Sequence, residues 1–213
     1  MRYTTVLFDL DGTLIDHFQA IHRCHAYAMQ QLGLPTPTMA QVCDAVGGGL
    51  DEAIACLAGA EKVPALLPHF IRHWSATHLD DVTLLPGAKE IVHALTAAGV
   101  TCAVLTNKRG YAAREVCDHL ALTPQLKGIF GVGDTAWLKP DPQFTQHVLT
   151  ALAANAASTL LVGDSPFDVQ TALNARLDFI GVTTGTHSAE ELAAAGATQV
   201  LPDLHAVQRA LFD

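Results

Sequence analysis

The stretch VLFDLDGTL at residues 6–14 joins an apolar run to two carboxylates that are one residue apart. The β-branched and aromatic residues before Asp9 predict a buried strand that carries charge to its carboxyl end. Because side chains alternate along a strand, we expect Asp9 and Asp11 to point to the same side and Leu10 to point away. Two close carboxylates disfavour each other's ionisation unless a cation lies between them, so the pattern favours a divalent metal.

The next two residues support this interpretation. Gly12 allows a sharp backbone turn where the strand ends, and Thr13 places a hydroxyl beside the carboxylates. The alternative for the motif alone is a strand that ends in a polar turn capping a helix.

Composition limits the classes of function. The chain has 213 residues, half of them apolar, which is enough for one domain with an insertion or for two small domains. A formal net charge of −9 disfavours binding to nucleic acid or to an anionic membrane, so we expect a small-molecule partner. No apolar run approaches the roughly twenty residues of a membrane span, and no signal pattern precedes the first strand, which predicts a cytoplasmic protein.

Residues 16–81 lose strand character and predict a helical insert after the first strand. Apolar residues recur at helical spacing from Ile21 to Leu32, and further helices are expected over 38–46, 50–57 and 63–79. The triplet formed by Gly47, Gly48 and Gly49 is either a flexible connector or a loop whose backbone approaches a ligand closely.

From residue 84 the pattern alternates strictly between helix and strand. Buried strands are expected at 100–107, 128–134, 159–165 and 179–185, with helices between them, and a short strand at 199–202 precedes a final helix. Ser188 with Glu191 forms a capping box, and Asp203 can cap the last helix. This alternation predicts an α/β fold, a Rossmann-like doubly wound parallel sheet with the helical insert after its first strand.

Ligands bind beyond the carboxyl ends of the strands in such sheets, and the distinctive polar residues fall there. They are the two aspartates of the first motif, Thr106 and Asn107, Lys139 before Pro140, and Asp164 and Asp168 of the stretch GDSPFD at 163–168.

Together, DLDGT at 9–13, TN at 106–107, KP at 139–140 and GDSPFD at 163–168 resemble the motifs of the haloacid dehalogenase superfamily, in that family's order. DLDGTLIDH, VGGGL and KPDP are similar to stretches of its phosphoglycolate phosphatase branch. The resemblance implies a catalytic core over 1–15 and 82–213 and a type 1 helical cap over 16–81.

The resemblance also implies a mechanism of phosphate ester hydrolysis. Asp9 would attack phosphorus and form an aspartyl-phosphate, and Asp11 would protonate the leaving alcohol and later deprotonate water. Mg²⁺ would be held by the Asp9 carboxylate, the Asp11 backbone carbonyl, Asp164 and Asp168, the last directly or through water.

The remaining site residues would neutralise and hold the phosphate. Lys139 would neutralise the nucleophile, while the Thr106 hydroxyl and the Asn107 backbone N–H donate to the phosphate. Thr13 is expected in the same substrate-binding set. Lys108 lies nearby, and we interpret it as solvated.

The substrate is expected to be a small phosphate monoester, such as phosphoglycolate or a sugar phosphate, and the protein a monomer or homodimer. Asp11 favours phosphate over a carbon–halogen substrate, which needs no acid at that position. A sugar-phosphate mutase shares the same core residues, and a phosphonate hydrolase would need a cap lysine, for which Lys62 is the candidate. A non-catalytic binding module is the alternative from another class. We expect the glycine triplet in the cap to influence substrate choice.

Overall fold

A computed structural model describes residues 2–213, and the chain divides into two compact units. The first unit joins the N-terminal segment up to Ile15 to everything from Leu84 onward, and the second comprises Asp16–Thr83.

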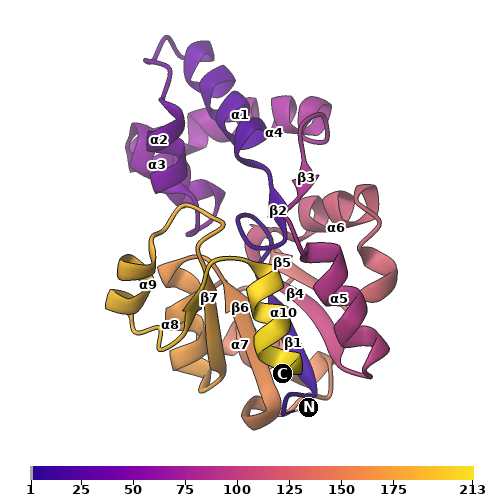
Figure 1. Ribbon diagram of the computed structural model, residues 1–213. Helices are drawn as coiled ribbons and strands as arrows, with labels where there is room; N and C mark the ends of the chain where they lie inside the picture. The colour runs from indigo at the N-terminus through magenta and orange to yellow at the C-terminus, as the bar shows by residue number, and fades with distance from the viewer. Residues whose placement is uncertain (1) are drawn as a thin grey trace. The chain divides into compact units, whose positions relative to one another are not determined.

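The first unit is built on a six-stranded sheet in which every pairing is parallel (Figure 1). The strand order is β5-β4-β1-β6-β7-β8. The strands are β1 (Thr5–Phe8), β4 (Thr101–Arg109), β5 (Ile129–Val132), β6 (Thr159–Gly163), β7 (Asp178–Val182) and β8 (Val200–Leu201). After β5 the chain returns past β1 to form β6, so the order of winding reverses beside β1, where such sheets bind ligands.

Helices cover both faces of this sheet, which confirms the doubly wound α/β fold. On one face, Leu7, Leu105 and Leu161 of the central strands pack against Phe144 and Val148 of α7. Helices α5 and α10 lie side by side on the other face (Figure 1). The helices of this unit are α5 (Ala88–Ala97), α6 (Gly110–His119), α7 (Pro142–Ala151), α8 (Pro166–Ala175), α9 (Ala189–Ala195) and α10 (Leu204–Phe212).

The predicted helix caps are confirmed. Ser188 and Glu191 form a reciprocal capping box at α9, and the Asp203 carboxylate accepts from the Ala206 N–H at the start of α10. These contacts satisfy backbone donors that have no partner within the first turn of a helix.

Two features differ from the sequence prediction. Strand β4 does not end at Asn107 but continues to Arg109, with a register shift against β5 between Leu105 and Arg109. The short strands β2 (Ile15–Asp16) and β3 (Thr83–Leu84) form a second sheet where the chain passes between the two units. Strands of two residues are too short to produce a recognisable alternation of apolar and polar residues in the sequence.

The second unit is helical. It contains α1 (Phe18–Gln31), α2 (Met39–Ala45), α3 (Leu50–Ala58), a 3₁₀ turn (Ala60–Lys62) and α4 (Val63–Thr77). Each helix overlaps a predicted one, and the break between α3 and α4 falls at Gly59, whose φ of 100° suits glycine.

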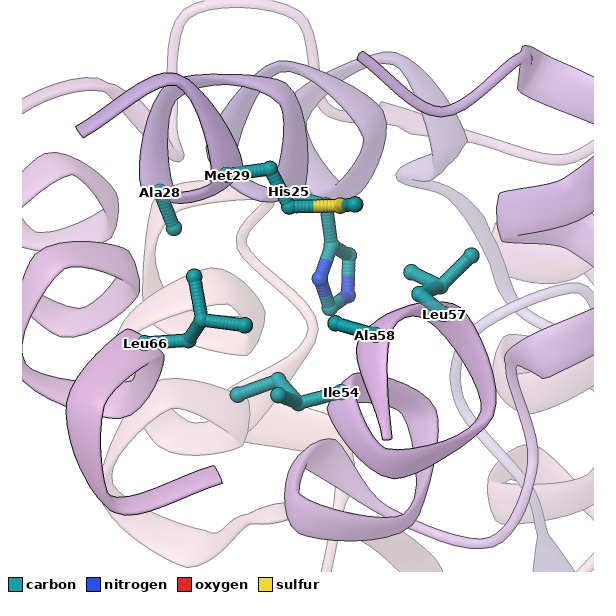
Figure 2. A pocket seen from close by; sticks show the side chains of 7 residues that line it. All are labelled: His25, Ala28, Met29, Ile54, Leu57, Ala58 and Leu66. Carbon is teal, nitrogen blue, oxygen red and sulfur yellow. The ribbon is translucent and has the colours of Figure 1, made fainter. Parts of the chain in front are cut away.

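The core of the second unit contains a buried histidine. His25 of α1 is 2% exposed and its ring packs 4.7 Å from that of Phe70 in α4. Figure 2 shows the imidazole surrounded by apolar side chains, among them Ile54 and Leu66. Burial lowers the pKa of His25 to about 4, with His22 adding to the effect, so this side chain is neutral near pH 7.

Within residues 2–213, no single helix is long and apolar enough to cross a membrane. The bent pair formed by Leu50–Ala58 and Ala60–Thr77 meets the same criterion by length and composition.

Candidate active site

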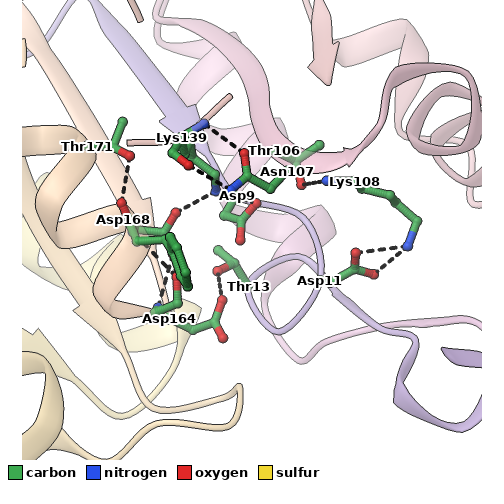
Figure 3. A network of polar contacts seen from close by, with 12 residues as sticks. Asp9, Asp11, Thr13, Thr106, Asn107, Lys108, Lys139, Asp164, Asp168 and Thr171 are labelled. Atoms are coloured by element: carbon green, nitrogen blue, oxygen red, sulfur yellow. Dashed lines mark hydrogen bonds and ion pairs between the residues drawn. The ribbon is translucent and has the colours of Figure 1, made fainter. Parts of the chain in front are cut away.

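A buried lysine joins two of the predicted carboxylates (Figure 3). The Lys139 Nζ lies 2.8 Å from Asp9 Oδ1 and 2.6 Å from Asp168 Oδ1. The lysine and Asp168 side chains are 1% and 0% exposed, and that of Asp9 is 11% exposed. A buried charge needs an opposite charge nearby, because water no longer solvates it. This contact brings together the end of β1, the first turn of α8 and the loop before α7.

Asp164 completes a cluster of three carboxylates with Asp9 and Asp168. One oxygen from each lies within 4.8 Å of the other two, and all three residues are buried. The Thr13 hydroxyl donates to Asp164 Oδ1 at 2.7 Å. The sequence analysis expected this hydroxyl beside Asp9 and Asp11, but its partner is the carboxylate of a residue 151 positions further along the chain.

Two glycines make room for the Asp164 carboxylate because they have no side chain. A Cβ at Gly12, which has a φ of 85°, would lie 2.4 Å from Asp164 Oδ2, and a Cβ at Gly185 would lie 1.7 Å from the same oxygen. Contacts under 3.0 Å are essentially never seen for a Cβ atom, so the carboxylate would have to shift. Both positions therefore require glycine while Asp164 keeps this conformation.

Burial sets the ionisation of the cluster. It raises the pKa of Asp9 to about 6; Lys139 opposes this shift and Asp168 adds to it. Burial also raises the pKa of Asp164 well above its usual range, and the nearby Asp9 and Asp168 charges raise it further. Burial alone would lower the pKa of Lys139, but the charges of Asp168 and Asp9 outweigh it and raise that pKa.

The charge and chemistry of the cluster fit a divalent cation. If all three carboxylates were ionised, the single ammonium group would leave two negative charges uncompensated, which is consistent with the raised pKa values of Asp9 and Asp164. The possible ligand atoms are carboxylate oxygens, the type that Mg²⁺ prefers. Asp9, Asp164 and Asp168 could therefore hold a divalent metal ion.

Asp168 has two structural roles at once. Its Oδ1 meets Lys139, while its Oδ2 accepts from the Ser165 hydroxyl at 2.6 Å and from the Ser165 N–H at 3.0 Å. Residues 165 and 168 thus form a capping box at the start of α8. The helix cap and the ion pair hold the carboxylate in one orientation.

Asp11 does not follow the predicted alternation. Strand β1 ends at Phe8, so the two-residue period no longer applies at Asp11. Its carboxylate is not part of the three-carboxylate cluster, and Lys108 Nζ contacts both of its oxygens, at 2.8 and 2.9 Å. Figure 3 shows the Asp11 side chain directed away from Asp9.

The interpretation of Lys108 as solvated was wrong. Its side chain is only 7% exposed, and that of Asp11 is 12% exposed. The register shift in β4 lets Lys108 turn toward Asp11, and its backbone N–H donates to the Thr106 hydroxyl oxygen at 3.2 Å. An irregular strand end cannot be recognised from a run of polar residues alone.

Asn107 makes a contact that the sequence analysis missed. Its Nδ2 donates to the Lys139 carbonyl at 3.0 Å, and its Oδ1 accepts from the Lys139 N–H at 2.8 Å. The amide therefore fixes the backbone of the residue whose side chain holds Asp9 and Asp168. The spacing of the two motifs places them at the same sheet edge but does not indicate this pairing.

The glycine triplet belongs to the second unit. Gly49 precedes α3 with a φ of 98°, and a Cβ at Gly48 would meet the Glu52 carboxylate at 2.1 Å. The substrate-binding role predicted for Gly47, Gly48 and Gly49 stays a prediction.

Known proteins resemble this chain along nearly its whole length. The model of the haloacid dehalogenase-like hydrolase family matches residues 6–182. A 5'-nucleotidase of Pseudomonas aeruginosa is 30% identical over 99% of this chain and 96% of its own. A phosphoglycolate phosphatase of Rhodospirillum rubrum is 31% identical over 93% of this chain and 86% of its own.

Solved structures support the fold. The crystal structure of a predicted phosphoglycolate phosphatase from Haemophilus somnus superposes with a TM-score of 0.92 at 20% identity and covers 99% of both chains. A haloacid dehalogenase-like hydrolase structure from Bacteroides fragilis has a TM-score of 0.91 at 24% identity, covering 96% of this chain and 99% of its own. With the family model spanning most of the sequence, the chain belongs to the haloacid dehalogenase-like hydrolases, in the branch that includes phosphoglycolate phosphatases.

Proposed function

We propose that this hydrolase is a Mg²⁺-dependent phosphatase that cleaves small-molecule phosphate monoesters through an aspartyl-phosphate. The observation that carries the proposal is the buried ion pair between Asp9 and Lys139, with Asp164 and Asp168 beside it. Relatives named as phosphatases and as a 5'-nucleotidase support the same reaction class.

In the first step, an Asp9 carboxylate oxygen attacks phosphorus. The bond from Asp9 oxygen to phosphorus forms as the ester bond breaks, and the leaving alkoxide takes a proton from Asp11. Asp11 must turn from the position in which Lys108 holds it to reach the leaving oxygen.

In the second step, water hydrolyses the aspartyl-phosphate. Asp11, now ionised, accepts a proton from water as the water oxygen bonds to phosphorus, and the bond to Asp9 breaks. Inorganic phosphate leaves, and both aspartates return to their starting protonation states.

Other residues hold the phosphoryl group. The Lys139 ammonium offsets the negative charge that attack develops, and the Thr106 hydroxyl oxygen accepts from the Lys108 N–H, which leaves its own hydrogen to donate. The Asn107 backbone N–H and the Thr13 hydroxyl complete the proposed binding set. Asn107 also keeps Lys139 in place through its side chain.

Asp9, Asp164, Asp168 and the Asp11 backbone carbonyl would hold the Mg²⁺ ion. When bound, this ion supplies positive charge that allows a phosphate dianion to approach the carboxylates.

We propose that the helical unit, Asp16–Thr83, is the cap domain and that it influences which ester is cleaved. A nucleoside 5'-monophosphate is the second candidate substrate, because the Pseudomonas aeruginosa relative named 5'-nucleotidase matches nearly the whole chain. A sugar-phosphate mutase would use the same core residues and pass the phosphoryl group to a sugar hydroxyl instead of water.

The proposal is tested by measuring phosphate release from 2-phosphoglycolate, sugar phosphates and nucleoside 5'-monophosphates, with Mg²⁺ or with EDTA. We expect Mg²⁺-dependent release by the wild type and a loss of at least about 10⁴-fold in kcat in Asp9→Asn, which removes the nucleophile with little change in shape. No Mg²⁺-dependent release from any ester would overturn the proposal. Isomerisation of a sugar phosphate without net release would establish the mutase instead.

A further inference from the structure

The loop that follows β7 reaches the carboxylate cluster, although none of its residues enters the proposed reaction. It begins at Thr183, directly after the strand. The Thr184 hydroxyl donates to the Gly12 carbonyl at 2.8 Å and so joins positions that are 172 residues apart. The backbone of Gly185 lies against Asp164, because a Cβ there would be 1.7 Å from Asp164 Oδ2. The loop therefore contacts both the turn after β1 and one of the three clustered carboxylates.

The Gly12 carbonyl belongs to the peptide that orients Thr13. Because a peptide is planar, a contact to its carbonyl oxygen also fixes the direction of the N–H that follows. The Thr13 N–H donates to the Leu10 carbonyl at 3.2 Å, while Thr184 holds the carbonyl side of the same peptide at 2.8 Å. Gly12 has a φ of 85° and no side chain to restrict this peptide. The two contacts hold the peptide from opposite sides, and that of Thr184 is the shorter.

Thr13 connects this peptide to the carboxylate cluster. The residue is 0% exposed, and its hydroxyl donates to Asp164 Oδ1 at 2.7 Å. A group that hydrogen-bonds a metal-binding carboxylate orients it, and removal of such a group typically weakens metal binding by about 10- to 100-fold. Thr184 is thus linked to Asp164 through one peptide and one side chain.

We propose that Thr184 is a positioning residue for the metal site, which fixes the peptide between Gly12 and Thr13 so that the Thr13 hydroxyl holds Asp164 in the orientation that binds Mg²⁺. This inference rests on the Mg²⁺ binding in the proposed function and adds to it a residue outside the four sequence motifs. In this role Thr184 contacts neither the ion nor the ester, and its substitution changes the affinity of the protein for the metal.

The test measures the Mg²⁺ affinity of the full chain without substrate. Thermal unfolding is followed during a Mg²⁺ titration, and the rise of Tm with concentration gives the Kd for Mg²⁺. Thr184→Val keeps the shape of the side chain and removes the hydroxyl. We expect it to raise this Kd by about 3- to 10-fold, as the loss of one hydrogen bond gives. Thr184→Ser keeps a hydroxyl and should bind Mg²⁺ nearly as the wild type does.

Thr183→Val is the matched control. Thr183 is exposed, and its hydroxyl donates to the Pro202 carbonyl at 3.4 Å. This variant should keep the wild-type Kd for Mg²⁺. Thermal unfolding in EDTA separates metal affinity from stability, because a purely structural contact of Thr184 would lower the Tm of the metal-free protein and leave the Kd unchanged. That result would overturn the positioning role.

The link through Thr13 is tested by Thr13→Val, alone and combined with Thr184→Val. Thr13→Val removes the hydrogen bond to Asp164 itself, so the Kd for Mg²⁺ should rise by about 10- to 100-fold. If Thr184 acts through Thr13, the double variant binds Mg²⁺ no more weakly than Thr13→Val. Effects that multiply in the double variant would mean that the two residues act independently, which contradicts the proposed link.

The outcomes separate this inference from the proposed function. Mg²⁺ binding by the wild type together with an unchanged Kd in Thr184→Val would overturn the role of Thr184 and leave the phosphatase proposal intact. A wild type whose Tm does not respond to Mg²⁺ would overturn the metal dependence of the proposed function and this inference together.

Discussion

The two units each bury titratable side chains, but in opposite surroundings. In the first unit, Asp9, Asp164 and Asp168 converge on the Lys139 ammonium, whose contacts with two of them are 2.6–2.8 Å long. In the second, the His25 imidazole lies among apolar side chains and the Phe70 ring (Figure 2). Burial shifts the pKa of Asp9 to about 6 and that of His25 to about 4.

The difference shows that a shifted pKa does not by itself identify a site. His25 responds to burial by staying neutral, and its surroundings need no ion. The cluster places three carboxylates around one lysine, so ionisation of all three would need a further cation beside them. The opposite charges that converge on the cluster distinguish it from an ordinary buried group.

The strongest test of this comparison is Lys139→Met, which removes the only cation that contacts the cluster in the ion pairs described above. Breaking a buried pair from one side leaves uncompensated charge, so we expect a loss of about 3–5 kcal/mol in the free energy of unfolding in EDTA. Phosphate release should also disappear. Urea denaturation followed by circular dichroism measures the first effect.

Lys127→Met is the matched control, because Lys127 is exposed and should change stability little. An equally small effect in Lys139→Met would mean that the cluster is mostly protonated without metal, and its contrast with His25 would disappear.

The next test measures how the free energy of unfolding depends on pH. Since the folded state lowers the pKa of His25 from 6.5 to about 4, the unfolded chain takes up a proton first as pH falls. Stability from this residue is therefore present above pH 6.5 and is lost as pH falls toward 4, by up to about 3 kcal/mol. We expect His25→Leu to unfold with a weaker pH dependence in this window.

His93→Gln, at an exposed histidine of α5, provides the comparison and should keep the wild-type pH dependence. If His25→Leu and wild type lose stability in parallel between pH 6.5 and 4, the imidazole is not excluded from water as the structure indicates.

The smallest expected effect is stabilisation by Mg²⁺. An ion that binds only the folded state at about 100 times its Kd adds about 2.7 kcal/mol to the free energy of unfolding. We expect thermal unfolding to show this gain in the wild type and to show little of it in Asp164→Asn. Glu90→Gln, which changes an exposed carboxylate, should respond like the wild type. Equal Mg²⁺ responses in all three proteins would place the ion elsewhere.

Much of the fold could be predicted from the sequence because its signals are local. Apolar runs such as that of β6 and caps such as Ser188 with Glu191 act over a few residues, and the rule for strand ends then brings distant motifs to one edge. The strands β2 and β3 were missed because two residues carry no periodicity.

The site was predictable only in part. Residue types and strand ends indicated Asp9, Lys139, Asp164 and Asp168, which the structure brings together. The direction of Asp11 was not predictable, because β1 stops one residue before Asp9 and alternation no longer applies.

The partners of Lys108 and the Asn107 side chain were also missed. Both depend on the register shift near the end of β4 and on pairing across the sheet edge, which no local pattern encodes.

The close packing around Asp164 limits which mutations the codons of the neighbouring glycines can accept. Every single-base change in a glycine codon that produces another amino acid introduces a Cβ atom. At Gly12 and Gly185 that atom would lie 2.4 and 1.7 Å from the Asp164 carboxylate. Every missense change one mutation away at these two codons therefore requires the same carboxylate to shift, whereas third-base changes keep glycine and leave the site as it is.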